Sequence, residues 1–265
     1  MTRERVFENR TVLVRGDRIA RIGRAGDVEV PRGALVIDAR GKYLMPGLAD
    51  MHVHVWCEGD LLLYVANGVT TIRNMSGSPR HLKWRERIES GDLLGPALFT
   101  SGPIIDADAD SRSPVSCDLG RGSGAGDARR RADVNRDRMT KALWDTGQRI
   151  FLGTDTANPF LIPGFSIHGE LRHLVEAGLT PYEALRSGTH NAAQFLKGRR
   201  EFGAVSEELR ADLILLHANP LEDVGHLEHR VGVMLRGRWY GQAELQSRLE
   251  DLASSYAAES KSVEP

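Results

Sequence analysis

The sequence predicts an α/β fold in which a parallel sheet carries helices and short β-strands lie near both chain ends. Between residues 43 and 104, strand-like apolar segments alternate with helical ones. Another apolar segment, residues 150–155, ends in the carboxylate of Asp155. The remaining strand patterns fall at residues 11–22, 34–38, 211–216 and 231–235. Because a few short strands do not make a stable sheet alone, we expect the chain ends to pair with each other; the alternative is two unrelated β-patches.

Turn signals connect the strands near the chain ends. Residues 11–14 and 18–22 flank Arg15-Gly16-Asp17, which predicts an antiparallel hairpin. Residues 34–38 predict a third strand, and Arg236-Gly237-Arg238 resembles the first turn. Both ends of the chain therefore carry short strand patterns next to similar turns.

The middle of the chain predicts β/α units. Residues 61–67 form a helix pattern, and Gly68 suits the C′ position that ends it. Residues 79–90 predict a charged amphipathic helix with Leu82 and Ile88 facing inward. The strands that alternate with these helices are predicted at residues 43–54, 69–75 and 97–102.

A long polar segment then interrupts the pattern. Within residues 106–138 the large aliphatic side chains are Val115, Leu119 and Val134. Such a segment cannot bury enough apolar surface to offset the entropy lost on ordering, so we predict a disordered or loosely draped loop. Helical patterns return at residue 139, and Thr180 and Glu183 predict a capping box for one of the later helices.

Composition and charge exclude several functional classes. The net charge is −1, with 41% hydrophobic and 27% charged residues, which is typical of a globular protein without electrostatic attraction to nucleic acid or anionic membranes. No apolar run approaches the ~20 residues of a membrane helix, and the N-terminus lacks a signal-peptide core. The two cysteines, Cys57 and Cys117, are too few for a disulfide framework, so a reducing cytoplasm is the expected location.

The strand that leads to His54 carries the most informative chemistry. Side chains alternate between the faces of a strand, so Asp50, His52 and His54 are predicted to share one face. Two imidazoles at this spacing can reach one metal ion, whereas the alternative is a pair of hydrogen-bonded core histidines. The apolar lead-in, the Pro46-Gly47 pair and the neighbouring carboxylate favour the metal. We expect Asp50 to orient a histidine or the strand.

These motifs resemble the amidohydrolase superfamily, in particular its imidazolonepropionase-like and prolidase-like members. Residues 44–54 (LMPGLADMHVH) resemble its first barrel strand, and residues 151–196, which begin FLGTDTANPF, resemble its last barrel strand and the following helices. Residues 211–224 (ADLILLHANPLEDV) and 232–240 (GVMLRGRWY) resemble strands of its small second domain. The resemblance covers roughly residues 10–105 and 135–245.

The resemblance implies a (β/α)8 barrel inserted into a small β-sandwich. We expect a composite β-sandwich domain from residues 1–46 and 200–245, a truncated β/α domain at residues 47–199, and a polar tail at residues 246–265. A full barrel needs about 250 residues, so this middle has room for about four βα units, which match the family's strands one, two, three and eight. The family's ligands on strands four, five and six have no counterpart, so the barrel is expected to be incomplete.

The resemblance also implies a metal site. Strands one and eight adjoin in a closed barrel, so His52, His54 and Asp155 are expected to bind Zn²⁺ or another divalent ion such as Mn²⁺ or Fe²⁺. In the complete family the strand-eight aspartate accepts a proton from activated water, so Asp155 is also the expected catalytic residue. His168 is the expected substrate-binding residue; the alternative is a polar residue at a helix start.

These inferences predict a metal-dependent hydrolase of carbon–nitrogen bonds in a small amide, cyclic amide or dipeptide-like substrate. Turnover is expected to be weak because the ligands of strands four to six are missing. The alternative is a catalytically inactive remnant that retains at most residual metal binding. Exposed barrel edges would also allow a homodimer. The ligand set suits a mononuclear iron oxygenase as well, but the β/α context favours a hydrolase.

Overall fold

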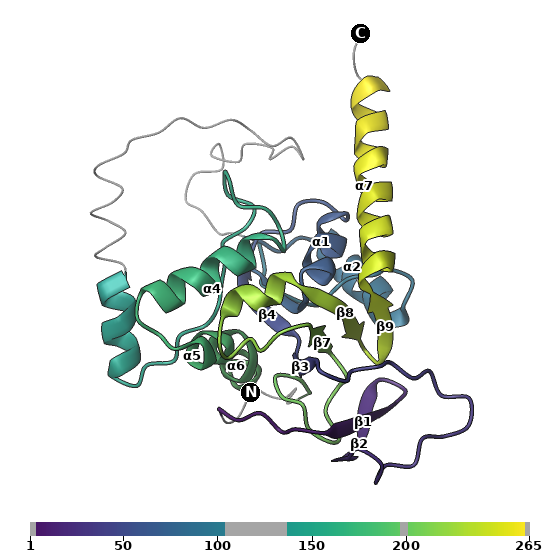
Figure 1. Cartoon of the computed structure of the whole chain (residues 1–265). Coiled ribbons are helices and arrows are strands. Elements are labelled where there is room, and N and C mark those ends of the chain that lie inside the picture. The colour runs from purple at the N-terminus through teal and green to yellow at the C-terminus, as the bar shows by residue number, and fades with distance from the viewer. Residues whose placement is uncertain (1–3, 104–136, 197–200, 263–265) are drawn as a thin grey trace.

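The computed structural model describes residues 4–103, 137–196 and 201–262. In this part of the chain, three sheets and several helices form an α/β architecture (Figure 1). The predicted polar loop falls almost entirely outside the described residues. Its last two positions, 137 and 138, belong to a helix that continues to residue 145.

Strands from both chain ends pair as expected. The hairpin of β1 (Arg10–Arg15) and β2 (Arg18–Arg24) is antiparallel. A second, antiparallel sheet has the order β3-β7-β8-β9, so an early strand pairs with a late one. Its strands are β3 (Tyr43–Pro46), β7 (Leu213–Leu216), β8 (Arg230–Leu235) and β9 (Arg238–Gly241).

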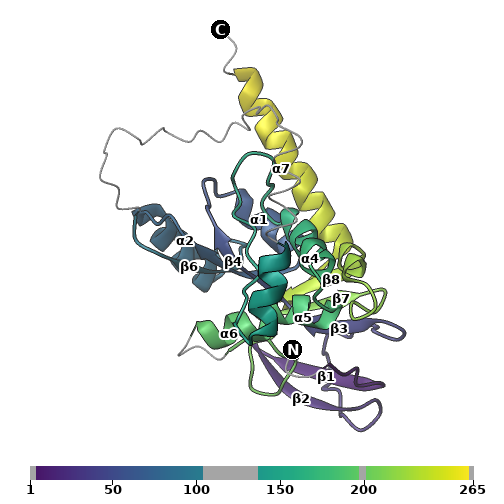
Figure 2. The same ribbon diagram turned by 90° about the vertical axis from the view of Figure 1, so that its left-hand side faces the viewer.

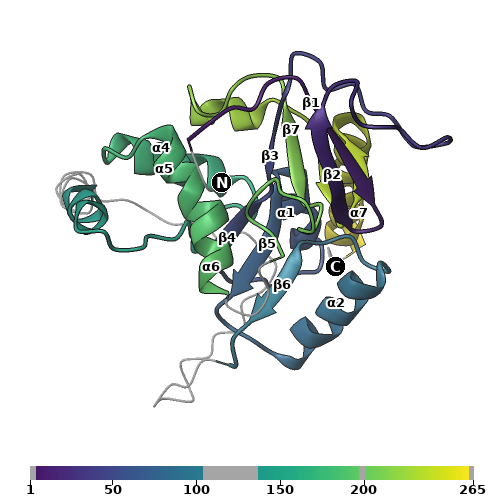
Figure 3. The same ribbon diagram turned by 90° about the horizontal axis from the view of Figure 1, so that it is seen from below.

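The hairpin packs on this four-stranded sheet (Figures 2 and 3). Ile19 is fully buried against Ala211 and Leu213, and its N–H donates to the Leu209 carbonyl at 2.9 Å. The Glu208 N–H donates in turn to the Ile19 carbonyl at 2.9 Å. The two ends of the chain therefore share a core, whereas their division from the β/α part into separate domains stays a prediction.

The strand predicted at residues 34–38 does not form. Leu35 is 78% exposed and Val36 is 71% exposed, and no strand of the described structure pairs with this segment. An apolar β-branched run needs a ladder partner and a surface to cover, and strand propensity alone supplies neither. The sequence prediction is wrong here for that reason.

The β/α part contains a parallel sheet of β4 (Leu48–Val53), β5 (Val69–Asn74) and β6 (Ala97–Thr100). The segment predicted as a strand at residues 150–155 runs parallel beside β4 without regular strand geometry. The Met51 N–H donates to the Leu152 carbonyl, and the Asp155 N–H donates to the His52 carbonyl, both at 2.8 Å. Among the described strands β6 pairs with β5 alone, and the homodimer through such an edge stays a prediction.

Helices pack on this sheet and form the main hydrophobic core with it. The core includes Ile72, Leu152 and Tyr64. In α2 the buried side chains are His81 and Ile88, whereas Leu82 is exposed, so the predicted inward face is confirmed for Ile88 and wrong for Leu82. The capping box of Thr180 and Glu183 and the positive φ of Gly68 are as predicted. The helical elements are α1 (Asp60–Ala66), α2 (Pro79–Ser90), α4 (Ser166–Glu176), α5 (Pro181–Arg186), η2 (Ser187–Asn191), α6 (Ala192–Phe195) and η3 (Val224–Glu228).

The last helix, α7 (Gln242–Ser262), packs its first turns on α1 and β8 and then extends away from the body (Figure 1). No helix among the described residues has the length and apolar character to cross a membrane. Cys57 is disulfide-bonded, whereas the low cysteine count led us to expect reduced thiols. The inference of a reducing compartment therefore has no structural support.

Candidate metal centre

His52, His54 and Asp155 meet at one edge of the parallel sheet. The two histidines lie at the C-terminal end of β4, and Asp155 lies at the end of the segment that runs beside it. Asp155 Oδ1 is 3.4 Å from His52 Nε2 and 3.0 Å from His54 Nε2. The ligand atoms of these residues all lie within 4.8 Å of one another. The structure therefore brings together the set that the sequence singled out.

This group is open to solvent. The side chains of His52 and Asp155 are each 49% exposed, and that of His54 is 19% exposed. The His54 ring stacks on Trp56, with centroids 6.0 Å apart and planes 10° apart. A small molecule can thus reach the three ligand atoms, while Trp56 restricts the orientation of one imidazole.

The donor set fits a divalent ion. Tetrahedral zinc with bonds of about 2.0–2.2 Å places its ligand atoms about 3.3–3.6 Å apart. The contacts of 3.0 and 3.4 Å from Asp155 Oδ1 to the two imidazoles are close to this spacing. Two imidazole nitrogens and one carboxylate oxygen also match the three protein ligands of catalytic zinc sites, which keep a fourth position open.

Backbone features shape the edge in ways that the sequence did not reveal. Asp155 has a φ of 57°, in the left-handed region that aspartate tolerates better than most residues. Gly153 lies against the histidine strand, and a Cβ at this position would be 3.0 Å from the Cβ of His52. The glycine therefore leaves room for the imidazole, and the turned backbone ends the segment at the ligand.

Asp50 does not lie with the histidines at the exposed edge. It is fully buried and accepts hydrogen bonds from the Thr154 N–H at 3.0 Å and the Thr154 hydroxyl at 2.6 Å. The register of β4 shifts between Asp50 and Val53. Asp50 also accepts from the His52 N–H at 3.3 Å, so it holds the strand that carries the ligand histidines, as expected, while the shared face stays a prediction. Asp50 instead ties residues 150–156 to β4.

A buried polar cluster continues from Asp50 toward helix α1. The Thr154 hydroxyl lies 3.2 Å from that of Thr156, which is 2.7 Å from the Tyr64 hydroxyl. Burial raises the pKa of Asp50 to about 7, although hydrogen bonds from Thr154 oppose the shift. Burial also raises the pKa of Tyr64. Sequence reasoning missed this cluster; the alternating threonines around Asp155 were the available signal.

His168 lies in the interior and not at the ligand edge. It is 6% exposed, and its Nε2 is 3.1 Å from Arg230 Nη1 and 3.2 Å from Asn67 Oδ1. A guanidinium only donates, so His168 Nε2 accepts from Arg230 and the ring is neutral, whereas Asn67 Oδ1 accepts from Arg230 Nη2 at 3.2 Å. Burial, followed by the charge of Arg230, lowers the pKa of His168 to about 4. We therefore assign His168 a packing role in place of the predicted substrate contact.

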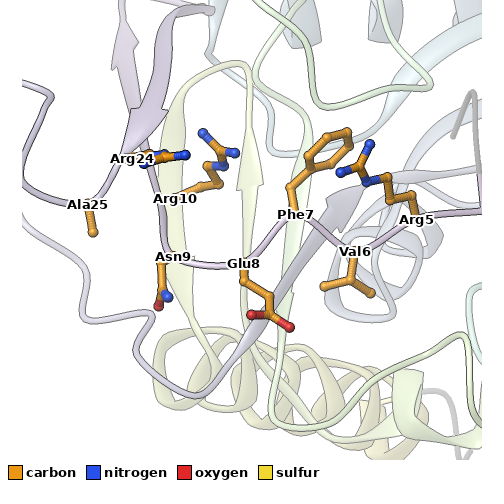
Figure 4. Close-up of a pocket in the computed structure, with 8 residues that line it drawn as sticks. All are labelled: Arg5, Val6, Phe7, Glu8, Asn9, Arg10, Arg24 and Ala25. Carbon is orange, nitrogen blue, oxygen red and sulfur yellow. The ribbon is translucent and has the colours of Figure 1, made fainter.

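A separate open pocket of about 490 Å³ lies at the start of the chain (Figure 4). The Arg5 guanidinium carbon is 4.9 Å from the centre of the Phe7 ring, and Arg10 also approaches this ring. Figure 4 shows the side chains of Phe7 and Glu8 on opposite sides of the chain. None of the predicted site residues lines this pocket, so we place no catalytic chemistry there. Its walls are Arg5, Val6, Phe7, Glu8, Asn9, Arg10, Arg24 and Ala25.

Comparisons with known proteins point to one family. The model of the amidohydrolase family matches residues 124–240. The imidazolonepropionase of Deinococcus deserti is 40% identical over 87 residues, which make up 32% of this chain and 21% of that protein. The match thus spans about a fifth of the relative's length.

Solved structures share the fold across most of the chain. A phenylurea hydrolase B matches with a TM-score of 0.70 and 17% identity, covering 90% of this chain and 94% of that one. A Xaa-Pro dipeptidase with bound methionine matches with a TM-score of 0.67 and 17% identity, covering 87% and 94%. With the His-x-His strand and Asp155 at one edge, the chain thus has the fold of these hydrolases and is similar to the amidohydrolase family over residues 124–240.

Proposed function

We propose that this protein is a metal-dependent hydrolase that cleaves a carbon–nitrogen bond in a small amide-like molecule. The observation that carries the proposal is the convergence of His52, His54 and Asp155 within 4.8 Å at a solvent-open edge. Similar proteins are named for the hydrolysis of a phenylurea and of a dipeptide, which supports an amide-like or urea-like substrate class. An amide, cyclic amide or dipeptide is therefore the substrate we propose.

Each ligand residue has a distinct role in this proposal. His52 and His54 would hold a divalent ion, zinc in the first place, through Nε2. A bound ion would supply a Lewis acid and lower the pKa of water. Asp155 directs Oδ1 at both imidazoles, and its Oδ2 has no hydrogen-bond partner among the described residues. Oδ2 is therefore the atom we assign to accept a proton during hydrolysis.

The fold leads us to propose weak turnover. We propose that β4, β5, β6 and the segment at residues 150–156 are the retained part of a (β/α)8 barrel. Two of the three ligand side chains are about half exposed, so water is poorly excluded from the reacting groups. This exposure also favours a second candidate, a non-catalytic amidohydrolase-like remnant with residual metal binding.

Metal analysis of purified protein tests the site. We expect about one zinc ion per wild-type chain after loading and dialysis, and loss of that ion in His52→Ala and Asp155→Ala, because each removes one of three ligands. His173→Ala is the matched control, since this exposed histidine lies on α4. Wild-type protein that stays metal-free would contradict the proposed site.

Turnover separates the two candidates. Zinc-loaded protein is assayed against a panel of N-acyl amino acids, dipeptides and phenylureas, with Asp155→Asn as the comparison. Product formation that exceeds the variant by about 100-fold, the size typical of a lost general base, supports the hydrolase. Equal background rates in both proteins, with zinc bound to the wild type, support the remnant.

A further inference from the structure

Two buried side chains hold the backbone immediately after the ligand His54. The Val55 N–H donates to Asn74 Oδ1 at 3.0 Å, and the Val55 carbonyl lies 2.8 Å from His81 Nε2. Both side chains are fully buried. The peptide that joins His54 to Val55 and the peptide that follows are thus each fixed by a separate residue.

The direction of the His81 contact follows from its other nitrogen. His81 Nδ1 lies 2.9 Å from the Ser78 N–H, which can only donate. Nδ1 is therefore the accepting nitrogen, and Nε2 carries the hydrogen that it donates to the Val55 carbonyl. The same ring caps the start of α2 and contacts Trp84, so its position is fixed from several sides.

Asn74 is equally well anchored. It is the last residue of β5, and its amide nitrogen donates to the Ser76 carbonyl at 2.9 Å and to the Thr100 hydroxyl at 3.0 Å. All the polar atoms of its side chain are therefore committed. The contact to Val55 is made from a rigid strand end and not from a free side chain.

His54 needs such support because β4 ends at Val53. Its own N–H donates to the Thr156 carbonyl, which fixes one side of the residue. The ladder between β4 and β5 does not extend to His54, so the contacts at Val55 take over where regular pairing stops.

We propose that Asn74 and His81 are positioning residues that fix the His54 imidazole for metal binding through the backbone of Val55. The inference rests on the proposed metal site and extends it to residues that touch no ligand. Outer partners that orient metal ligands typically contribute 10–100-fold to affinity.

The test compares two amide substitutions of one residue. In His81→Gln the side-chain amide reaches the place of Nε2 and can donate to Val55, and glutamine also suits a capping box. In His81→Asn the shorter amide occupies the place of Nδ1, keeping the cap and losing the contact to Val55. We measure Co²⁺ affinity by calorimetry, the visible spectrum of bound Co²⁺, and urea unfolding of the metal-free protein.

We expect His81→Asn to weaken Co²⁺ binding 10–100-fold and to alter the spectrum, while His81→Gln stays within about threefold of wild type. Asn74→Leu, which acts on the other peptide, should weaken binding in the same way. If both His81→Asn and Asn74→Leu keep the wild-type affinity and spectrum, the inference is overturned while the proposed metal site stands. Equal losses in His81→Gln and His81→Asn, matched by equal losses of stability, overturn it in favour of general packing. Wild-type protein that binds no Co²⁺ overturns the proposed metal site and the inference together.

Discussion

The molecule places the same side chain in two opposite environments. At the edge of the parallel sheet, His52 and His54 face a carboxylate and are open to solvent. In the first turn of helix α4, His168 is buried and faces the guanidinium of Arg230. An acid partner and access favour a ligand, whereas a cation and burial hold the ring neutral and unreachable.

The difference shows that position in the fold, more than residue type, decides which histidine can act. His52 and His54 lie where a strand ends at an open edge, a place that local spacing reveals. His168 lies in the first turn of α4, and its ring faces Arg230 in β8, which also donates to Asn67 at the end of α1. No short sequence pattern connects these three residues.

Removing Arg230 should break the buried environment and leave the edge intact. The Arg230 guanidinium donates to the carbonyls of Ala66, at 3.0 Å, and Leu227, and to Asn67 Oδ1 at 3.2 Å. Arg230→Met keeps the apolar stem and leaves these acceptors unpaired, so we expect a loss of about 3 kcal/mol in unfolding free energy. Urea unfolding measures the loss.

The comparison needs a matched substitution in the same kind of element. Arg21→Met replaces an exposed arginine in β2 and should change stability by no more than about 0.5 kcal/mol. Zinc binding should be unchanged in both proteins. A loss below about 1 kcal/mol in Arg230→Met, or a loss of zinc, would show that the two regions are not independent in this way.

Acid should weaken the buried environment through His168. The pKa of this residue falls from 6.5 to about 4 on folding, so between these values the unfolded chain binds a proton that the folded chain does not. Stability therefore decreases as pH falls, by about 1.5 kcal/mol between pH 6.5 and pH 5. The charges that face the ring are Arg230 in β8, Glu228 in η3 and Arg172 in α4.

His168→Gln isolates this contribution, because its amide oxygen can accept from Arg230 and does not titrate. Unfolding free energies are measured at several pH values in both proteins. The wild type should lose about 1.5 kcal/mol more than the variant over this range. Parallel pH profiles would contradict the assignment of a neutral, buried imidazole.

Much of the fold could be predicted because its elements are locally encoded. The hairpin at Gly16, the helix at residues 79–90 and the capping box at Thr180 each depend on residues within a few positions of one another. The strand at residues 34–38 failed because pairing is a tertiary event that the segment itself does not encode. Leu82 was predicted to face inward, but His81 takes that place because it has hydrogen-bond partners in the interior.

The candidate site, like the fold, was predicted from the sequence only in part. The meeting of His52, His54 and Asp155 was expected from a strand pattern together with a family resemblance, and the three ligand atoms do converge. The supporting residues were not found, because Asn74, His81 and Thr154 act through contacts between elements. The burial of Asp50 was not foreseen, because its partner Thr154 lies about a hundred positions later in the chain.

A substitution in the buried polar cluster behind the ligand edge is expected to have the smallest effect on unfolding free energy. Tyr64 contributes its hydroxyl to Thr156 at 2.7 Å, at the end of the cluster that is farthest from Asp50. Tyr64→Phe removes this one hydrogen bond and keeps the ring, so we expect a loss of about 1 kcal/mol in unfolding free energy. Zinc binding should persist because Thr154 still ties Asp50 to the segment that carries Asp155. Tyr182→Phe on α5 is the control, and release of zinc by Tyr64→Phe alone would mean that the ligand edge depends on the whole cluster as far as helix α1.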